Sequence, residues 1–213
     1  LDRREKNISD ELTSSGKSIS SISGMSNKSL SLDLFGFPIE GVDVQGGAII
    51  TDLDGNTFNE IYYGSDSVVY GKWMGGLDVN GFPFDAGAEI STNISSGDLD
   101  GDGDKEVVFG TSNGVVYALT KTGTVHMSYQ QEDHIVDVPV LSDLDQDGDM
   151  EVIFISSNDS SSTLYALHDT GDNVTGFPVI FSESIAACPS IADLNNNMVL
   201  DIVIVTLNGN VYV

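Results

Sequence analysis

An acidic loop followed at once by an apolar strand occurs four times in this chain, and this repeat constrains its fold more than any other feature. The four copies are TDLDGNTFNEIYY from Thr51, GDLDGDGDKEVVF from Gly97, SDLDQDGDMEVIF from Ser142 and ADLNNNMVLDIVI from Ala192. Their first aspartates are 46, 45 and 50 residues apart, at Asp52, Asp98, Asp143 and Asp193. A period of this size accommodates three or four short strands and is typical of solenoids and propellers.

The residues after each acidic loop are apolar on both faces of the expected strand, as in 107–109 and 152–154. A strand of this composition is covered by other sheets on both sides, and a propeller blade lies between two other blades. The sequence therefore predicts an all-β fold, a β-propeller made of four blade repeats, with the four acidic loops at one end of the assembly.

Gly-Phe-Pro occurs at Gly36, Gly81 and Gly176, in each case before the next acidic loop. Because proline donates no hydrogen bond to a sheet ladder, we expect these segments to be outer edge strands. Each unit then contains an inner strand, the acidic loop, a second strand, a third strand and the edge strand. The second unit departs from this order, because residues 124–129 stand where Gly-Phe-Pro is expected.

This order of strands leaves the closure of the propeller open. The edge-type strand around Phe37 has no inner strands before it, and the last unit reaches Val213 without an edge strand. These two parts either pair and complete a closed ring of four blades, or they are the ends of an arc that belongs to a larger propeller. We expect the arc.

Charge divides the chain near residue 30. The whole chain has a net charge of −25, yet residues 1–28 carry five of its eight basic residues and only four of its 33 acidic residues. We interpret residues 1–30 as a polar, serine-rich linker or the end of a preceding domain, and residues 31–213 as the propeller repeats. An acidic surface repels nucleic acid phosphates, and no segment is apolar enough to span a membrane as a helix. We expect neither a nucleic acid partner nor a membrane span in this segment.

The acidic loops have the composition of a calcium site. In the second loop Asp98, Asp100, Asp102 and Glu106 occupy positions 1, 3, 5 and 9, and the backbone carbonyl of Asp104 is available at position 7. Carboxylates this close together repel one another unless a cation neutralises them. Oxygen ligands from a flexible loop suit Ca²⁺ better than Mg²⁺, and the loops contain no Cys or His that would indicate zinc.

The four loops differ at the turn and in their charge. The second and third loops have glycine at position 6, Gly103 and Gly148, where a sharp turn often needs positive φ, whereas Thr57 and Met198 stand there in the others. The fourth loop contains only two carboxylates, because amides replace the rest. We therefore expect calcium affinity to be highest in the second and third loops, lower in the first and lowest in the fourth. An EF-hand is excluded, because position 12 of the second and third loops is a phenylalanine inside a β run.

The acidic loop with its hydrophobic strand ending in Tyr63-Gly64 or Phe109-Gly110 resembles the FG-GAP or VCBS-type repeats of integrin α-chain propellers and of many secreted microbial proteins. The resemblance covers residues 33–213 and implies an extracellular, Ca²⁺-binding propeller. The third and fourth units lack that glycine, which affects their expected turn geometry but not their loops. The implied calcium ligands are Asp52, Asp54, Asn56, Phe58 and Glu60; Asp98, Asp100, Asp102, Asp104 and Glu106; Asp143, Asp145, Asp147, Asp149 and Glu151; and Asp193, Asn195, Asn197, Val199 and Asp201.

The chain shows no catalytic motif. It contains no H-E-x-x-H and no G-x-S-x-G pattern, and its paired carboxylates have metal-ligand spacing. We expect Trp73 to pack between blades rather than to bind carbohydrate, and Cys188 to be a buried, unreactive thiol. We expect the three histidines to lie in surface turns, at His126, His134 and His168.

Two functions remain open. The first is an extracellular binding or adhesion scaffold, in which calcium stiffens a propeller that presents loops to a protein or glycan partner. The second is a non-catalytic accessory domain of a secreted hydrolase or lyase. Halophilic adaptation is a third explanation of the charge, but the four loops already account for at least 13 acidic residues.

Overall fold

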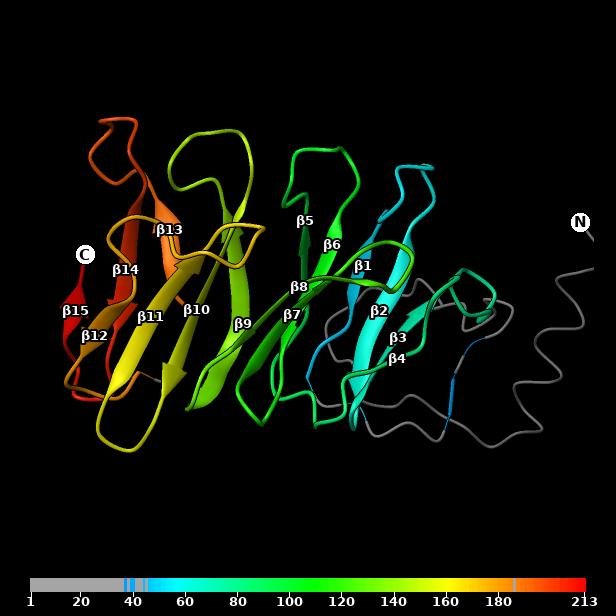
Figure 1. Cartoon of the computed structure of the whole chain (residues 1–213), viewed down its shortest axis with the longest axis horizontal. Helices are drawn as coiled ribbons and strands as arrows, with labels where there is room; N and C mark the ends of the chain where they lie inside the picture. Colours follow the sequence, from blue (N-terminus) through cyan, green and yellow to red (C-terminus); the bar gives the residue numbers. More distant parts are fainter. Residues whose placement is uncertain (1–36, 38, 41–43, 45, 186) are drawn as a thin grey trace, which may run out of the picture. The chain divides into compact units, whose positions relative to one another are not determined.

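The computed structural model describes residues 37, 39–40, 44, 46–185 and 187–213. Every regular element in these residues is a β-strand, and the strands form four antiparallel sheets (Figure 1). The all-β fold is therefore as predicted. None of the described residues lies in a helix that could span a lipid bilayer.

Each sheet is a meander, because its strands pair in chain order. The first sheet contains β1 (Ile49–Thr51), β2 (Glu60–Ser65), β3 (Val68–Lys72) and β4 (Phe84–Asp85). The second contains β5 (Ser95–Gly97), β6 (Glu106–Gly110), β7 (Val115–Leu119) and β8 (Val125–Gln130). The third contains β9 (His134–Ser142), β10 (Glu151–Ser157), β11 (Ser162–Leu167) and β12 (Val179–Phe181). The fourth contains β13 (Ser190–Ala192), β14 (Asp201–Val205) and β15 (Val211–Tyr212).

This arrangement is the repeat unit predicted from the sequence. In every sheet the acidic loop joins the first strand to the second, and the ladder places the two ends of the loop side by side, as Thr51 lies opposite Glu60. In a meander the connection between the third and fourth strands lies at the same edge as the connection between the first and second. All four acidic loops lie at the same end of the strands, as expected (Figure 1).

Apolar side chains fill the space between neighbouring sheets. Every residue of β6 and of β10 is buried, which confirms that these strands are covered on both faces. Phe109 packs toward the first sheet in a cluster with Tyr62, whereas its neighbour Val108 packs toward the third sheet in a cluster with Phe154. Successive residues of one strand thus stabilise opposite interfaces, each by about 1.5–3 kcal/mol when fully buried. In β14 only Ile204 is fully buried, so the fourth sheet is less covered.

Gly64 and Gly110, near the ends of the second strands, have a different role from the one expected. Neither has positive φ, so neither shapes a turn. A Cβ atom on Gly64 would lie 2.9 Å from Ile90 Cγ2, and one on Gly110 would lie 2.9 Å from Ile135 Cβ. These glycines therefore leave room for an isoleucine of the next unit. In the third sheet the corresponding residue is Ile155, which is itself fully buried.

Gly-Phe-Pro marks the outer strands but does not form them. Gly81 and Gly176 have φ values of 88° and 100°, and β4 and β12 begin directly after the two prolines. The predicted edge strands are thus confirmed, but the motif itself is the turn that leads into each of them, because glycine supplies the positive φ that this turn needs. The second sheet has its outer strand, β8, without the motif.

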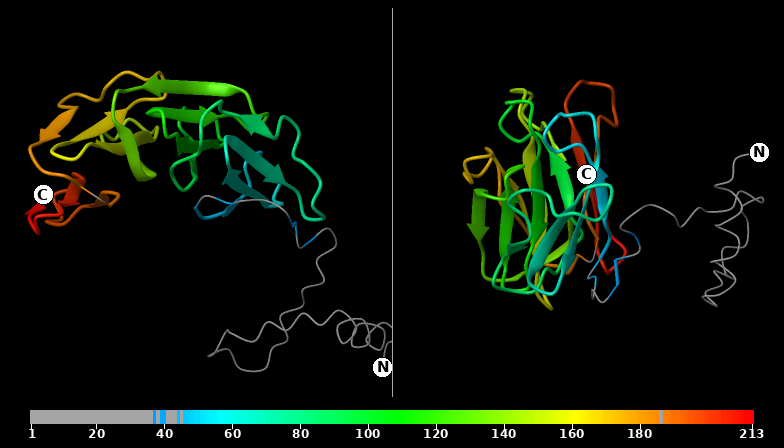
Figure 2. Two further views of the ribbon diagram at one scale, coloured as in Figure 1. Left: turned by 90° about the horizontal axis from the view of Figure 1, so that it is seen from below. Right: turned by 90° about the vertical axis from the view of Figure 1, so that its right-hand side faces the viewer.

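The first and fourth sheets lie at opposite ends of the row that the four sheets form (Figure 2). The described sheets are therefore part of a propeller, in agreement with the expected arc, and they do not form the closed ring of four blades. Of the first Gly-Phe-Pro segment only Phe37 is described, and the predicted boundary near residue 30 lies outside the described residues.

Gly110→Ala should destabilise the fold, because the added methyl group would lie 2.8 Å from Thr92 Cγ2 and 2.9 Å from Ile135 Cβ. Overpacking of this kind lowers the free energy of unfolding by about 1–3 kcal/mol. Gly47→Ala is the control, because an added Cβ there has Asn93 Oδ1 as its nearest neighbour at 3.4 Å and φ is not positive. Urea unfolding followed by circular dichroism measures both variants. Equal stability of the two would contradict the packing role of Gly110.

Candidate metal centre

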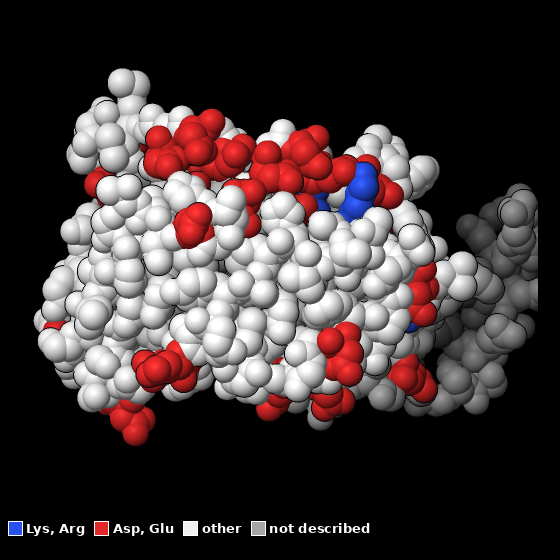
Figure 3. Space-filling model, viewed as in Figure 1, with Lys and Arg blue, Asp and Glu red and all other residues white. Residues whose placement is uncertain are grey.

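The four acidic loops lie side by side at one end of the strands, and we call this row of loops the acidic edge. They are residues 52–60, 98–106, 143–151 and 193–201, numbered loops 1 to 4 in chain order. Each loop begins directly after the first strand of its sheet, and its position 9 is the first residue of the second strand. Aspartate and glutamate residues gather along this edge (Figure 3).

A carboxylate at position 9 anchors every loop by accepting a hydrogen bond from the backbone N–H at position 2. The donor and acceptor pairs are Leu53 and Glu60 at 3.0 Å, Leu99 and Glu106 at 3.0 Å, Leu144 and Glu151 at 2.6 Å, and Leu194 and Asp201 at 2.9 Å. The three glutamates are only 1%, 3% and 0% exposed. Their place at the start of a buried strand holds them there, so the repeat puts a carboxylate at the same point under each loop.

Several carboxylate oxygens at the acidic edge are buried without a hydrogen-bond donor. They include Oε1 of Glu60 and of Glu151, together with Oδ1 of Asp98 and of Asp143. A charged oxygen that has lost its water without gaining a partner is strongly unfavourable. Accordingly, burial raises the pKa of Glu60, Glu106 and Glu151 above that of an ordinary glutamate. A divalent cation would supply the missing charge, so these residues fit a metal ion.

In each of three loops, several acidic side chains lie close enough together to bind one ion. Within each group, one ligand atom from every residue lies within 4.8 Å of the others. The groups are Asp52, Asp54 and Glu60 in loop 1; Asp98, Asp100 and Glu106 in loop 2; and Asp145, Asp147, Glu151 and His168 at loop 3. Loop 4 has only two carboxylates and forms no such group. The structure thus brings expected ligands together in three loops, and these acidic clusters could hold a metal ion.

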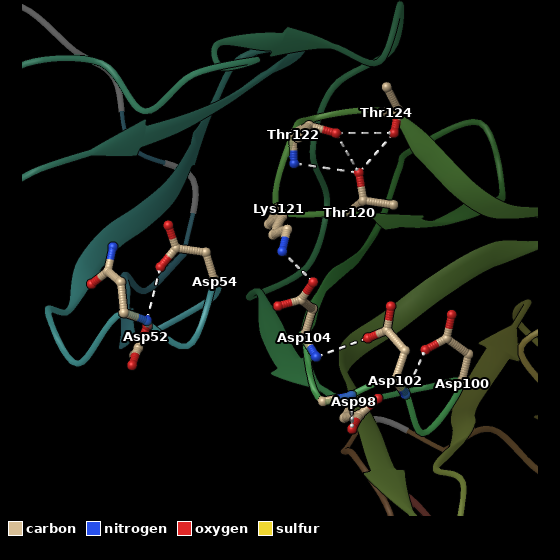
Figure 4. A network of polar contacts seen from close by, with 12 residues as sticks. Asp52, Asp54, Asp98, Asp100, Asp102, Asp104, Thr120, Lys121, Thr122 and Thr124 are labelled. Atoms are coloured by element: carbon tan, nitrogen blue, oxygen red, sulfur yellow. Dashed lines mark hydrogen bonds and ion pairs between the residues drawn. The ribbon is translucent and has the colours of Figure 1, made fainter.

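Other expected ligand residues make different contacts. Asp102 Oδ1 accepts the N–H of Asp104 at 2.8 Å, and the Asp104 carboxylate forms an ion pair with Lys121 (Figure 4). Asn56 and Asn197 accept backbone N–H groups two residues further along their own loops, each at 2.8 Å. The residues outside the three groups stay predicted ligands: Asn56, Phe58, Asp102, Asp104, Asp143, Asp149, Asp193, Asn195, Asn197, Val199 and Asp201.

The backbone of the loops explains the residues at their turns. In loops 1, 2 and 4 the carboxylate at position 1 accepts the N–H of position 6, as Asp98 does from Gly103 at 3.0 Å. Position 6 has positive φ in all four loops, whether or not it is glycine: Thr57 (76°), Gly103 (92°), Gly148 (107°) and Met198 (68°). Position 4 has positive φ as well, a requirement that the sequence analysis missed: Gly55, Gly101, Gln146 and Asn196.

Neighbouring loops touch one another along the acidic edge. The N–H of Lys105 in loop 2 donates to the carbonyl of Leu53 in loop 1 at 3.1 Å. A Cβ atom on Gly101 of loop 2 would lie 2.4 Å from Asp149 Oδ1 of loop 3, and the amide of Gln146 in loop 3 donates to a carbonyl of loop 4. Burial and the surrounding carboxylates raise the pKa of Asp149. Each candidate site therefore contacts the loop of a neighbouring site.

Two histidines lie against acidic loops. His126 and His134 lie in strands β8 and β9, so the expectation of a surface turn is wrong for these two, whereas His168 begins the turn 168–171, as expected. His126, in β8, has Nδ1 4.0 Å from Asp100 Oδ2 and Nε2 3.8 Å from Asp169 Oδ2. His168, directly after β11, has Nδ1 3.5 Å from Glu151 Oε1. The meander is the reason, because it returns the connection between the third and fourth strands to the edge that carries the acidic loop. Counting strands from each acidic loop would have found His168.

Trp73 and Cys188 show how far the remaining expectations hold. Trp73 packs against the core between the first and second sheets, as expected. Cys188 is only partly buried, so the expectation of a buried thiol is wrong. It precedes β13 instead of lying within it, and its N–H is 3.4 Å from Asp137 Oδ2. Partial burial still raises the pKa of the thiol.

A family model described as FG-GAP-like repeat matches residues 143–204, which extend from loop 3 into β14. This part of the chain is therefore similar to FG-GAP-like repeats. Since the other two complete sheets have the same order of strand, acidic loop and strand, the FG-GAP type of propeller expected from the sequence is confirmed. No curated protein sequence matches the chain.

Solved structures with a similar fold show the same architecture. A chain in the crystal structure of BBS1N in complex with ARL6DN is 16% identical, with a TM-score of 0.55 over 77% of this chain and 48% of that one. Rhamnogalacturonan lyase YesW is 15% identical, with a TM-score of 0.56 over 79% and 42%. The V. cholerae biofilm matrix protein Bap1 is 15% identical, with a TM-score of 0.50 over 79% and 30%. This chain thus spans less than half of each of these structures, and at such identities the likeness shows the fold alone.

Stabilisation by Ca²⁺ should weaken at low pH. The raised pKa values of Glu60, Glu106 and Glu151 mean that these groups bind protons more tightly in the folded chain than in the unfolded chain, where the pKa is near 4.5. In the presence of EDTA their contribution to stability therefore falls as pH rises from about 4.5 through the raised pKa. Ca²⁺ bound beside these groups would offset this loss, so the rise in Tm with Ca²⁺ should be larger at about pH 7.5 than at about pH 5.

Scanning calorimetry at both pH values measures this effect. Glu60→Gln should reduce the difference between them, because it removes one titrating carboxyl group and keeps its volume. A rise in Tm that is equal at both pH values would contradict a cation at the buried glutamates.

Position 6 allows a matched pair of stability tests. Gly148→Ala should lower the free energy of unfolding by about 1 kcal/mol, because φ is 107° and no other atom lies within 4 Å of an added Cβ. Met198→Gly should raise it by about 0.5–1 kcal/mol, because Met198 is 80% exposed and has a φ of 68°. Denaturant unfolding in EDTA measures both. Changes of the same sign in the two variants would show that strain at position 6 does not govern loop stability.

Proposed function

We propose that this chain is part of an extracellular, calcium-stabilised β-propeller that acts as a binding or adhesion scaffold for a protein or glycan partner. The observation that supports this proposal best is the buried glutamate at position 9 of loops 1 to 3. Each of these glutamates uses one oxygen to hold the loop backbone, and in loops 1 and 3 the other oxygen has no hydrogen-bond donor. A cation beside such a group offsets the cost of burying its charge.

Oxygen chemistry supports calcium for loops 1 and 2. The converging side chains there are all carboxylates, and amides, carbonyls and water can complete the six to eight oxygen ligands that Ca²⁺ takes. Magnesium requires a tighter octahedral arrangement, and structural zinc sites use cysteine or histidine.

The architecture suits a scaffold. Packed sheets hold the connections at both edges in fixed positions, and loops on a rigid framework are where binding residues concentrate. One similar structure is named as a biofilm matrix protein, and another is a complex of two named proteins. These names support a binding role for this chain but do not identify its partner.

An accessory domain of a secreted hydrolase or lyase is the second candidate. The observation that favours it is the likeness to a rhamnogalacturonan lyase, of which this chain spans 42%. We propose no catalytic residue in this segment, because its converging carboxylates have the spacing of metal ligands. Binding of the purified chain to a polysaccharide, without cleavage, favours this candidate over a protein-binding scaffold.

With no transition metal present, calcium should stabilise the chain and bind mainly through loops 1 to 3. Extracellular calcium modules have Kd values on the order of 10⁻⁴–10⁻³ M, and a site at ten times its Kd adds about 1.4 kcal/mol to the free energy of unfolding. Asp100→Ala should remove one site, whereas Asn195→Ala in loop 4 should change binding little. Isothermal titration calorimetry of chelator-treated protein measures the number and affinity of the sites, and thermal melting measures the stabilisation.

Asp66→Ala is a control for the loss of one carboxylate outside the acidic loops. A melting curve that Ca²⁺ and EDTA both leave unchanged would refute the metal-binding function. Equal losses for Asp100→Ala and Asn195→Ala would refute the proposed order of loop affinities.

A further inference from the structure

We propose that loop 3 is a site for a divalent transition metal, Zn²⁺ or Mn²⁺, in which His168 supplies a nitrogen ligand beside the carboxylates of the loop. The inference rests on the proposed metal-binding function of the acidic edge. It goes beyond that function because it assigns a different class of metal to one loop and adds a ligand from outside the repeat motif.

Four side chains meet at this place. Ligand atoms of Asp145, Asp147, Glu151 and His168 lie within 4.8 Å of one another, and this is the one group of the acidic edge, among the described residues, that includes an imidazole. Donor atoms around zinc or manganese are each about 2.0–2.2 Å from the ion and hence about 3–4 Å apart. The four atoms therefore need to move by only about 1 Å to enclose an ion of this size.

Glu151 provides a second and independent indication of a ligand. Its side chain is completely buried, and its Oε2 accepts the N–H of Leu144 at 2.6 Å. Its Oε1 has no hydrogen-bond partner and lies 3.5 Å from His168 Nδ1. A separation of 3.5 Å is too long for a direct hydrogen bond and suits two ligands of one ion.

The chemistry of the donors decides the class of metal. Ca²⁺ takes oxygen ligands and gains little from an imidazole, whereas imidazole is a preferred ligand of zinc and other first-row transition metals. Three carboxylates and one imidazole give an anionic site of mixed oxygen and nitrogen donors. Such a site favours Zn²⁺ or Mn²⁺ over Ca²⁺, while the oxygen-only groups of loops 1 and 2 keep Ca²⁺.

The second sheet contains a natural control at the equivalent position. Leu119 of β7 pairs with Val107, the second residue of β6, and Leu167 of β11 pairs in the same way with Val152, the second residue of β10. Thr120 and His168, the residues that follow these leucines, therefore occupy equivalent positions in the second and third sheets. Both of these residues donate their N–H to the carbonyl four residues further on, each at 2.9 Å. Lys121, the residue after Thr120, forms an ion pair with Asp104 of loop 2 (Figure 4). His168→Thr therefore removes the imidazole from the third sheet, and Thr120→His places one at the equivalent position of the second sheet, where the backbone makes the same hydrogen bond.

The test uses the full chain after removal of metals with a chelator. Zn²⁺ is titrated calorimetrically in excess Ca²⁺ into the wild type, His168→Thr, Thr120→His and His134→Thr, the last of which removes an exposed histidine remote from the acidic loops. We expect His168→Thr to weaken Zn²⁺ binding at least about tenfold and to leave Ca²⁺ binding at loops 1 and 2 unchanged. Thr120→His should create a second Zn²⁺ site, and His134→Thr should have no effect.

Pulsed electron paramagnetic resonance of bound Mn²⁺ provides a direct readout. The wild type should show coupling to a coordinated imidazole nitrogen that is lost in His168→Thr, a signature that an ion pair between His168 and Glu151 does not produce. Unchanged Zn²⁺ affinity and nitrogen coupling in His168→Thr would overturn the inference. If that variant does not fold, the absence of new nitrogen coupling in Thr120→His overturns it instead. Ca²⁺ binding without Zn²⁺ binding refutes this inference alone, whereas a chain that binds neither ion refutes the proposed function as well.

Discussion

The structure of the acidic edge depends on one hydrogen bond, which the N–H at position 2 of each loop donates to the carboxylate at position 9. In loops 1 to 3 this carboxylate belongs to a buried glutamate at the start of the second strand, so the fold cannot form there without taking it out of water. One of its oxygens then holds the loop in place. In loops 1 and 3 the other oxygen has no hydrogen-bond donor, so a cation bound there would link the stability of the sheet to the chemistry of the loop.

The same constraint explains why much of the fold could be predicted from the sequence. An acidic loop and an apolar strand that recur every 45–50 residues specify the strand order, the common edge of the loops and the burial of β6 and β10. These features depend on local pattern and on period, which a single sequence displays. The aspartates at positions 1 and 3 and the glutamate at position 9 follow from the same pattern, as in Asp52, Asp54 and Glu60.

The parts that could not be predicted depend on contacts between units. Gly110 has the sequence position of a turn residue, and only the approach of Ile135 from the next sheet shows that its missing side chain is a packing requirement. Similarly, His168 is 17 residues from Glu151 along the chain, and the meander brings the two together. The positive φ at position 4 cannot be predicted from the sequence pattern, because glutamine and asparagine stand there in two loops instead of glycine.

The contacts between neighbouring loops have a mechanical consequence. Lys105 joins loop 2 to loop 1, Asp149 lies against Gly101, and Gln146 joins loop 3 to loop 4, so the acidic edge is a continuous seam across all four sheets. Tension that pulls neighbouring sheets apart has to break these contacts between loops as well as the apolar packing between the sheets. An ion bound in one loop, as proposed, would also fix the contact point for the next loop, so the resistance of the molecule to stretching should then depend on the metal content of its surroundings.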